Sequence, residues 1–235
     1  MTRRDFGELS VRLTGGSDRE GGGDGPLVVL FHGFGAPGED LVPLGRVMHV
    51  PDGTRFAFPA APIQLPMGFG DARAWWEIDV MALEQAIARG EVRDMSGTVP
   101  DGLPEARALA VDAVAALIEA LGPSRVVLGG FSQGAMLALD VALHSDVELA
   151  GLVLMSGTLL AEKEWRARLD ARSGLPIFQS HGRLDPLLSY DIAERLKQML
   201  DEGGLPVTFV PFRGAHEIPP TVLSGVEEFL GDVLE

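Results

Sequence analysis

One serine of the sequence lies between glycines in a pattern suited to nucleophilic catalysis. The residues Gly130-Phe131-Ser132-Gln133-Gly134 read G-x-S-x-G. The apolar run 125–129 before them predicts a buried strand, and the residues after them favour a helix. A sharp turn between strand and helix projects the serine hydroxyl from the edge of a sheet, and small residues on either side let the two elements approach closely. Ser132 is therefore the candidate nucleophile.

A serine hydroxyl reacts poorly unless a base removes its proton, and the five histidines are the candidates for that base. His216, in the sequence GAHEI, follows the last predicted strand and precedes the last predicted helix, so we expect it to be the base. His32 and His181 each precede a glycine at the end of a predicted strand, which favours structural roles. His49 and His144 lie in polar settings typical of surface or helix-end positions.

The base in turn needs a carboxylate that orients the imidazole and stabilises its charged form. When a serine follows a strand in this way, the acid lies between serine and histidine in chain order. Asp185 lies in that interval, directly after the predicted strand 176–179. Asp170 and Asp201 fall within or beside helical stretches, and Asp191 fits the first turn of a helix. We therefore expect Asp185 to complete the triad.

Two backbone N–H groups could hold the oxyanion that forms during acyl transfer, those of Gln133 and Phe34. Phe34 lies in the loop after the predicted strand 26–31. The same loop, Gly33–Gly38, is a literal G-x-G-x-x-G, the fingerprint of dinucleotide-binding folds. Pro37 stands where the helix of that fingerprint should be running, which favours the oxyanion loop. A nucleotide-binding oxidoreductase remains the alternative.

The elements that must position these residues alternate along the chain. The runs that predict strands are 9–13, 26–31, 55–59, 125–129, 149–155, 176–179 and 207–211. Helical periodicity recurs between them, most clearly from Ala110, Ile192 and Val222. This alternation indicates an α/β fold with a mainly parallel sheet flanked by helices, a three-layer sandwich. No repeat or linker interrupts 1–235, which we expect to be one domain, and the Gly-rich segment 15–25 predicts a turn.

Residues 60–102 break this pattern, because they are too long and too apolar for an ordinary connection. We expect an irregular insertion that packs over the sheet edge and covers a ligand pocket. Its large apolar side chains are the candidate substrate-binding residues, namely Met67, Phe69, Trp75 and Trp76. The two tryptophans could also be plain core, and two in tandem cannot both face one way along a strand.

Composition narrows the classes of partner and chemistry. The 235 residues carry 19 Lys and Arg against 34 Asp and Glu, a formal charge of −15, which argues against nucleic acid and anionic membrane surfaces. Without cysteine there is no disulfide, thiolate nucleophile or cysteine-ligated zinc. No His, Asp or Glu cluster has metal-ligand spacing, so we expect neither metal nor cofactor. No apolar run reaches the roughly 18 residues of a membrane span.

The N-terminal Arg3-Arg4 lacks the apolar stretch of an export signal, so we expect a cytoplasmic protein. Its expected partner is a small-molecule ester. The sequence is compatible with a homodimer but does not select an oligomeric state.

Four segments together resemble one family. They are LFHGFG at 30–35, GFSQGA at 130–135, HGRLD at 181–185 and GAH at 214–216, and they look like the small phospholipase/carboxylesterase family, which includes the acyl-protein thioesterases. RAWWEID at 73–79 is similar to the W-[FW]-x-[IL] segment of that family. The resemblance extends from about residue 26 to the C-terminus.

This resemblance implies an α/β-hydrolase fold and hydrolysis of carboxylic esters or thioesters through an acyl-enzyme. It assigns the triad to Ser132, Asp185 and His216. The chain departs from the family within 60–102, where 81–90 predicts an added helical piece, so the resemblance does not choose between esters, thioesters and lysophospholipids. A non-catalytic binding protein on the same fold is a further alternative, against which the intact triad speaks.

Overall fold

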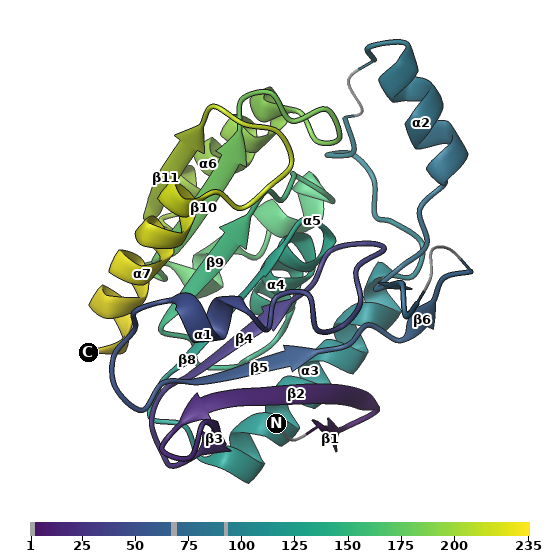
Figure 1. The fold of residues 1–235 in the computed structure, drawn as a ribbon. Coiled ribbons are helices and arrows are strands. Elements are labelled where there is room, and N and C mark those ends of the chain that lie inside the picture. The colour runs from purple at the N-terminus through teal and green to yellow at the C-terminus, as the bar shows by residue number, and fades with distance from the viewer. Residues whose placement is uncertain (1–2, 67–69, 92–93) are drawn as a thin grey trace.

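Within residues 3–66, 70–91 and 94–235, which the computed structural model describes, a nine-stranded sheet organises the chain (Figure 1). Its strands are β1 (Arg3–Phe6), β2 (Leu9–Gly16), β3 (Glu20–Gly22), β4 (Leu27–Phe31), β5 (Arg55–Pro59), β8 (Val126–Phe131), β9 (Gly151–Met155), β10 (Ile177–Gly182) and β11 (Val207–Phe212). The longer helices are α2 (Val80–Ala88), α3 (Leu103–Leu121), α4 (Gln133–His144), α6 (Tyr190–Glu202) and α7 (Pro220–Leu234), and the short ones are α1 (Leu44–Val47), α5 (Glu162–Arg166) and the 3-10 turn η1 (Leu169–Arg172).

The strands lie in the order β1-β2-β5-β4-β8-β9-β10-β11, with β3 beside β2. β2 is antiparallel to β1 and to β5 and parallel to the short β3, whereas every pair from β5 to β11 is parallel. β4 and β9 are buried along their whole length. Continuous apolar runs of this kind form strands with both faces covered by helices.

Helices cover both faces of the sheet, so the core has two parts. One part lies under α3, α4 and α6, and the other under α1 and α7 (Figure 1). The predicted three-layer α/β sandwich with a mainly parallel sheet is therefore confirmed. None of the helices in the described part of the chain is long and apolar enough to cross a membrane.

Two strands of the main sheet, β1 and β3, were not expected. β1 buries only its last residue, so it has no apolar run to mark it. Within the segment predicted as a turn, β3 pairs with β2, and the carboxylate of Asp18 closes the connection by accepting hydrogen bonds from the backbone N–H groups of Glu20 (2.7 Å) and Gly22 (2.8 Å). Segment 15–25 therefore extends the sheet edge instead of only reversing the chain.

The unusual segment 60–102 contributes a separate pair of short strands, β6 (Ile63–Gln64) and β7 (Arg73–Ala74), followed by α2. The Asp79 carboxylate caps α2 by accepting a hydrogen bond from the Ala82 N–H at 2.9 Å. α2 stands apart from the main body, beyond the end of the sheet at which β8 and β10 finish (Figure 1). The helical piece expected over 81–90 is thus present as α2.

Candidate active site

Ser132 lies between the end of β8 and the start of α4 in a strained backbone conformation, with φ 55° and ψ −119°. The flanking glycines make this turn possible. A Cβ on Gly134 would lie 2.0 Å from the carbonyl oxygen of Phe31, and one on Gly130 would lie 2.5 Å from the carbonyl carbon of Gly134. Only glycine fits at either position, so the G-x-S-x-G spacing follows from the close approach of β4, β8 and α4.

The loop after β4 lies directly against this serine. A Cβ on Gly33 would come 3.3 Å from the Ser132 Cβ, and the neighbouring Phe34 lines the same cavity as Ser132. The Gly35 N–H donates to the Arg73 carbonyl (2.8 Å), and the Arg73 N–H donates to the Ala36 carbonyl (3.1 Å). β7 therefore holds the loop that carries the Phe34 N–H, while Gln133, as the first residue of α4, presents its own N–H at the helix N-terminus.

The geometry of the glycine loop does not favour dinucleotide binding. Residues 33–38 are all described and contain no helical turn, and the chain runs through further turns before α1 begins at Leu44. The fingerprint requires a helix N-terminus at this point to receive a pyrophosphate.

Asp185 and His216 follow adjacent parallel strands, β10 and β11, and their side chains meet. Nδ1 of His216 lies 2.6 Å from Oδ2 of Asp185. The Asp185 side chain is wholly buried, whereas the His216 side chain is 12% exposed. Gly182 permits this approach, because a Cβ there would lie 2.1 Å from the Ala215 carbonyl oxygen.

The surroundings of Asp185 keep its carboxylate ionised. Burial by itself would raise the pKa of Asp185, but hydrogen bonding to His216 and its positive charge outweigh that effect. The backbone N–H groups of Leu187 (2.8 Å) and Leu188 (3.0 Å) donate to Oδ1 and add to the stabilisation. The pKa of Asp185 is therefore below its ordinary value, and the ion can stabilise a charged imidazole.

His181 lies unexpectedly close to this pair. Its Nε2 is 2.9 Å from the Leu188 carbonyl oxygen and 3.3 Å from Oδ2 of Asp185. Burial is the main cause that lowers the pKa of His181, and the nearby Asp185 charge opposes it only in part. The ring therefore stays neutral beside the carboxylate. The sequence favoured a structural role for His181 but did not place it at the candidate triad.

The other three histidines lie away from the serine or serve the fold. His32 is buried, with Nδ1 2.8 Å from the Gly33 carbonyl oxygen and Nε2 accepting a hydrogen bond from the Ala61 N–H at 3.0 Å. His144 ends α4 and contacts the Glu164 carboxylate at 2.7 Å. His49 is exposed.

A cavity of about 190 Å³ joins Ser132 and His216. The other residues that line it are mainly apolar and come from the loop after β4, the segment 60–102, α4 and the loop after β10: Gly33, Phe34, Ala36, Asp40, Ile78, Leu83, Met95, Phe131, Gln133, Met136, Leu187 and Leu188. The rings of Phe131 and His216 lie 4.8 Å apart. In the described residues no group of three or more acidic or histidine side chains could hold a metal ion.

The candidate substrate-binding residues are placed differently from one another. Trp75 is 1% exposed, lies in the core and is absent from the described lining of the catalytic cavity. Trp76 is also buried and lines a neighbouring cavity. Met67 and Phe69 lie outside the described residues.

The side chain of Gln133 has a structural role that the sequence did not predict. Its Oε1 accepts a hydrogen bond from the Trp75 N–H (2.9 Å), and its Nε2 donates to the Trp76 carbonyl (2.9 Å). The Trp75 indole N–H donates to the His32 carbonyl (2.9 Å). The residue after the serine thus clamps the segment 60–102 onto the site. The sequence pointed to Gln133 only for its backbone N–H, not for its side chain.

Known proteins resemble the chain over most of its length. Residues 21–234 match the family described as Phospholipase/Carboxylesterase. Acyl-protein thioesterase 1 of Neurospora crassa is 28% identical over 219 residues, which are 88% of this chain and 86% of the relative. Among solved structures, esterase PE8 is 27% identical with a TM-score of 0.79, covering 96% of this chain and 99% of its own. Acyl-protein thioesterase 2 of Zea mays shares the fold, with 23% identity, a TM-score of 0.70 and the same coverage.

These similarities are compatible with both esters and thioesters as substrates. They give no support to the oxidoreductase alternative. The chain belongs to the phospholipase/carboxylesterase family and is a serine hydrolase of esters or thioesters.

Proposed function

We propose that the protein hydrolyses small esters or thioesters through a triad of Ser132, His216 and Asp185. The observation that carries the proposal is the 2.6 Å contact between His216 and the buried Asp185, in a histidine that shares an apolar cavity with Ser132. A base that is oriented by a carboxylate and lies beside a strained serine is the arrangement of nucleophilic acyl transfer.

The reaction runs in two halves. Ser132 Oγ attacks the carbonyl carbon while Nε2 of His216 takes its proton, and Asp185 stabilises the imidazolium. The N–H groups of Gln133 and Phe34 hold the tetrahedral oxyanion. His216 then protonates the departing alcohol or thiol, which leaves an acyl group on Ser132. Water, deprotonated by His216, attacks the acyl carbon, and collapse of the second tetrahedral species releases the acid and restores the serine.

The cavity favours acyl groups of short to medium length. Its volume of about 190 Å³ lies below the range of roughly 300–1,000 Å³ typical of pockets for drug-sized ligands. Ile78, Leu83 and Met95 supply apolar contact with the chain. All three belong to 60–102, so we assign that insertion the role of covering the acyl pocket. The 235 residues form one domain in this proposal, because the two parts of the core share one sheet.

Two measurements test the proposal. A fluorophosphonate probe should label the wild type at Ser132, as located by mass spectrometry, and should label neither Ser132→Ala nor heat-unfolded protein. p-Nitrophenyl butanoate and butanoyl thioesters should both be turned over. Labelling at another residue, or equal turnover by Ser132→Ala, would reject the assignment.

Every residue the mechanism uses comes from a single chain. A homodimer, which the sequence leaves open, is therefore not required, and analytical ultracentrifugation decides it. The cytoplasmic location stays a prediction of the sequence, to be tested by cell fractionation.

A further inference from the structure

A second cavity, of about 570 Å³, lies behind the catalytic one. The two cavities have three lining residues in common, Ile78, Met95 and Met136, which therefore form a partition between them. Two of these three are methionines. A methionine side chain is unbranched, with three rotatable bonds, and adapts readily to the shape of its neighbours.

Met136 is tied to the nucleophile by the helix. It lies four residues after Ser132 in the first turn of α4, and its N–H donates to the Ser132 carbonyl at 3.2 Å. Its side chain is 5% exposed. This side chain lines both cavities.

Met95 supplies the second methionine of the partition, and hydrogen bonds hold the loop on which it lies. The Thr98 N–H donates to the Met95 carbonyl (2.9 Å), and Arg195 holds the loop by contacting the Asp94 carboxylate (2.7 Å) and the Ser96 hydroxyl (3.3 Å).

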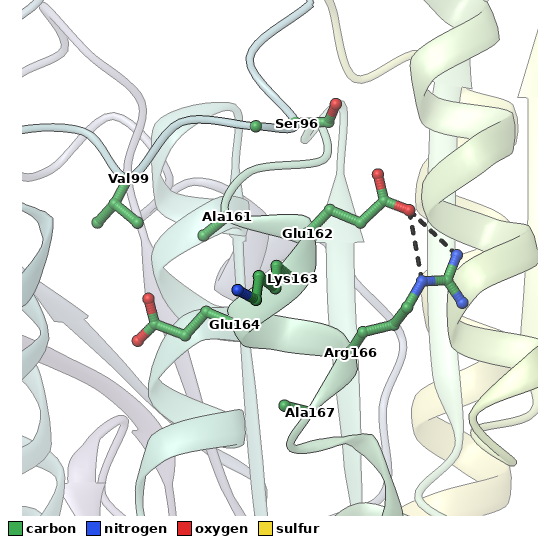
Figure 2. Close-up of a pocket in the computed structure, with 9 residues that line it drawn as sticks. Ser96, Val99, Ala161, Glu162, Lys163, Glu164, Arg166 and Ala167 are labelled. Atoms are coloured by element: carbon green, nitrogen blue, oxygen red, sulfur yellow. Dashed lines mark hydrogen bonds and ion pairs between the residues drawn. The ribbon is translucent and has the colours of Figure 1, made fainter.

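The same loop is also attached to the start of α5. The Glu162 N–H donates to the Ser96 carbonyl (2.7 Å), and the Ala161 N–H donates to the Thr98 carbonyl (3.0 Å). Figure 2 shows a surface cavity that Ser96 and Val99 of this loop line together with residues of α5, where Glu162 is paired with Arg166. The loop that carries Met95 is therefore attached through its backbone to the residues that begin α5.

We propose that Met136 and Met95 determine the acyl length that the enzyme accepts, and that the second cavity receives the distal part of a longer acyl chain once these side chains give way. This inference rests on the proposed ester hydrolysis at Ser132. Trp76, Pro100 and Leu160 give the second cavity an apolar surface suited to a hydrocarbon tail.

The remaining lining of the second cavity specifies the far end of that tail. Glu77, Asp79 and Asp101 contribute exposed carboxylates, and Asp94 contributes a fourth whose charge the ion pair with Arg195 partly balances. A neutral terminus is accepted there, whereas a terminal carboxylate is repelled by like charge. The fitting substrate class is thus an ester of an unbranched acid without a charged ω-end.

The test compares p-nitrophenyl esters from butanoate to dodecanoate, below their critical micelle concentrations, on the wild type, Met136→Ala and Met95→Ala. Met48→Ala is the matched control, because Met48 is nearly as buried (8%) but packs on the other face of the sheet. The wild type should gain up to about fourfold in kcat/KM per methylene and then lose activity when the first cavity is full. In either partition variant the optimum should move by two or more carbons, and the dodecanoate-to-butanoate ratio should rise about tenfold or more, the gain expected from two added methylenes.

An ester substrate with a charged tail tests whether the space gained by the partition variants is the second cavity. Replacing the dodecanoate ester by the monoester of dodecanedioic acid should remove the gain in kcat/KM that the partition variants show. Glu77→Gln, combined with either partition variant, should restore part of that gain. Profiles of Met136→Ala and Met95→Ala that both overlay the Met48→Ala profile would overturn the inference, as would an equal gain with the charged tail.

The test gives a result even if one of the two variants does not fold. Met95 is only half-buried, so Met95→Ala carries the test should Met136→Ala fail to fold. The inference also fails separately from the proposed function. A wild type that neither hydrolyses butanoate esters nor labels at Ser132 removes both, whereas normal wild-type turnover with unchanged variant profiles removes only the partition.

Discussion

The imidazole of His216 and the carboxylate of Asp185 share one short hydrogen bond, 2.6 Å from Nδ1 to Oδ2, while the other carboxylate oxygen is held by the backbone of residues 187 and 188. The carboxylate is thus held by the backbone independently of its contact with the imidazole. This division of its two oxygens makes the first prediction specific.

Asp185→Asn should lower kcat by a factor on the order of 10³–10⁴ and leave the protein folded. Its Oδ1 can still accept both backbone N–H groups, but its amide N–H₂ would face Nδ1 of His216 and favour the wrong tautomer. Steady-state kinetics and circular dichroism measure the two effects. Asp191→Asn, an exposed carboxylate in the first turn of α6, is the control and should retain wild-type kinetics. A kcat for Asp185→Asn within tenfold of wild type would mean that another group orients the histidine.

The strained backbone of Ser132 predicts an order of stability among inactive variants. Both Ser132→Ala and Ser132→Gly should lose the nucleophile, but only glycine tolerates φ 55° and ψ −119° without a Cβ penalty. Ser132→Gly should therefore be the more stable of the two by about 1 kcal/mol, even after the extra backbone entropy of glycine in the unfolded chain. Urea titrations at one pH give both free energies of unfolding. Equal values would show that the elbow stores no strain at this residue.

The pKa of His32 predicts how stability depends on pH. Burial is the main cause that lowers this pKa from 6.5 to about 4, with Arg73 adding to it and the Gly33 carbonyl opposing it. Between pH 6.5 and about 4 the unfolded chain therefore binds a proton that the folded chain does not, so stability falls as the pH is lowered through this window. The loss is at most on the order of 3 kcal/mol.

His32→Gln should flatten the curve of unfolding free energy against pH in that window, as measured with urea at pH 7.5 and 5.0. His49→Gln is the control, because the His49 side chain is 94% exposed, and should keep the wild-type slope. Two other groups contribute to any remaining slope in His32→Gln. Burial also lowers the pKa of His181, which adds a loss in the same direction, whereas burial raises the pKa of Asp40 to about 6, which stabilises the folded chain as the pH falls. A slope in His32→Gln as steep as in wild type would assign the whole effect to other groups.

The clamp formed by Gln133 predicts a loss of both stability and activity when its side chain loses its polar atoms. Gln133→Met would leave the buried Trp75 N–H and Trp76 carbonyl without partners, at a cost of about 2–4 kcal/mol in the free energy of unfolding. The clamp holds Trp75 and Trp76, which lie just before Ile78 of the cavity lining, so kcat/KM should fall as well. Denaturant titration and ester kinetics measure the two losses.

Gln179→Met is the matched control for the clamp. Gln179 is about as buried, but within the described residues its side chain makes a single hydrogen bond, from Nε2 to the Ala193 carbonyl of α6 (2.8 Å), and none to the segment 60–102. It should cost less stability and leave kcat/KM unchanged. Unchanged kinetics in Gln133→Met would reduce the clamp to a purely structural element.

Local rules were enough to predict the central elements and the order of the candidate site residues. β4 and β9 appear as continuous apolar runs because both of their faces are covered, and Ser132 was identifiable because only glycines fit on either side of its turn. Asp185 and His216 follow successive strands, and the carboxyl ends of parallel strands lie at one edge of a sheet, so their proximity followed from the fold class. The overall chemistry therefore depended on sequence-local signals and one topological rule.

The tertiary structure alone decided which side chains face the cavity. Trp75 and Trp76 were candidates for the pocket wall by their size, yet Trp75 packs into the core, and Leu187, Leu188 and Met136 line the cavity from other segments. The contact of His181 with Asp185 was not predicted either, because it depends on how the chain turns as it leaves β10. The clamp of Gln133 was not predicted because it joins α4 to a segment that is distant in the sequence. Periodicity reports whether a side chain is buried, but not which buried side chains leave space between them; that is set by how loops of different lengths pack over the end of the sheet.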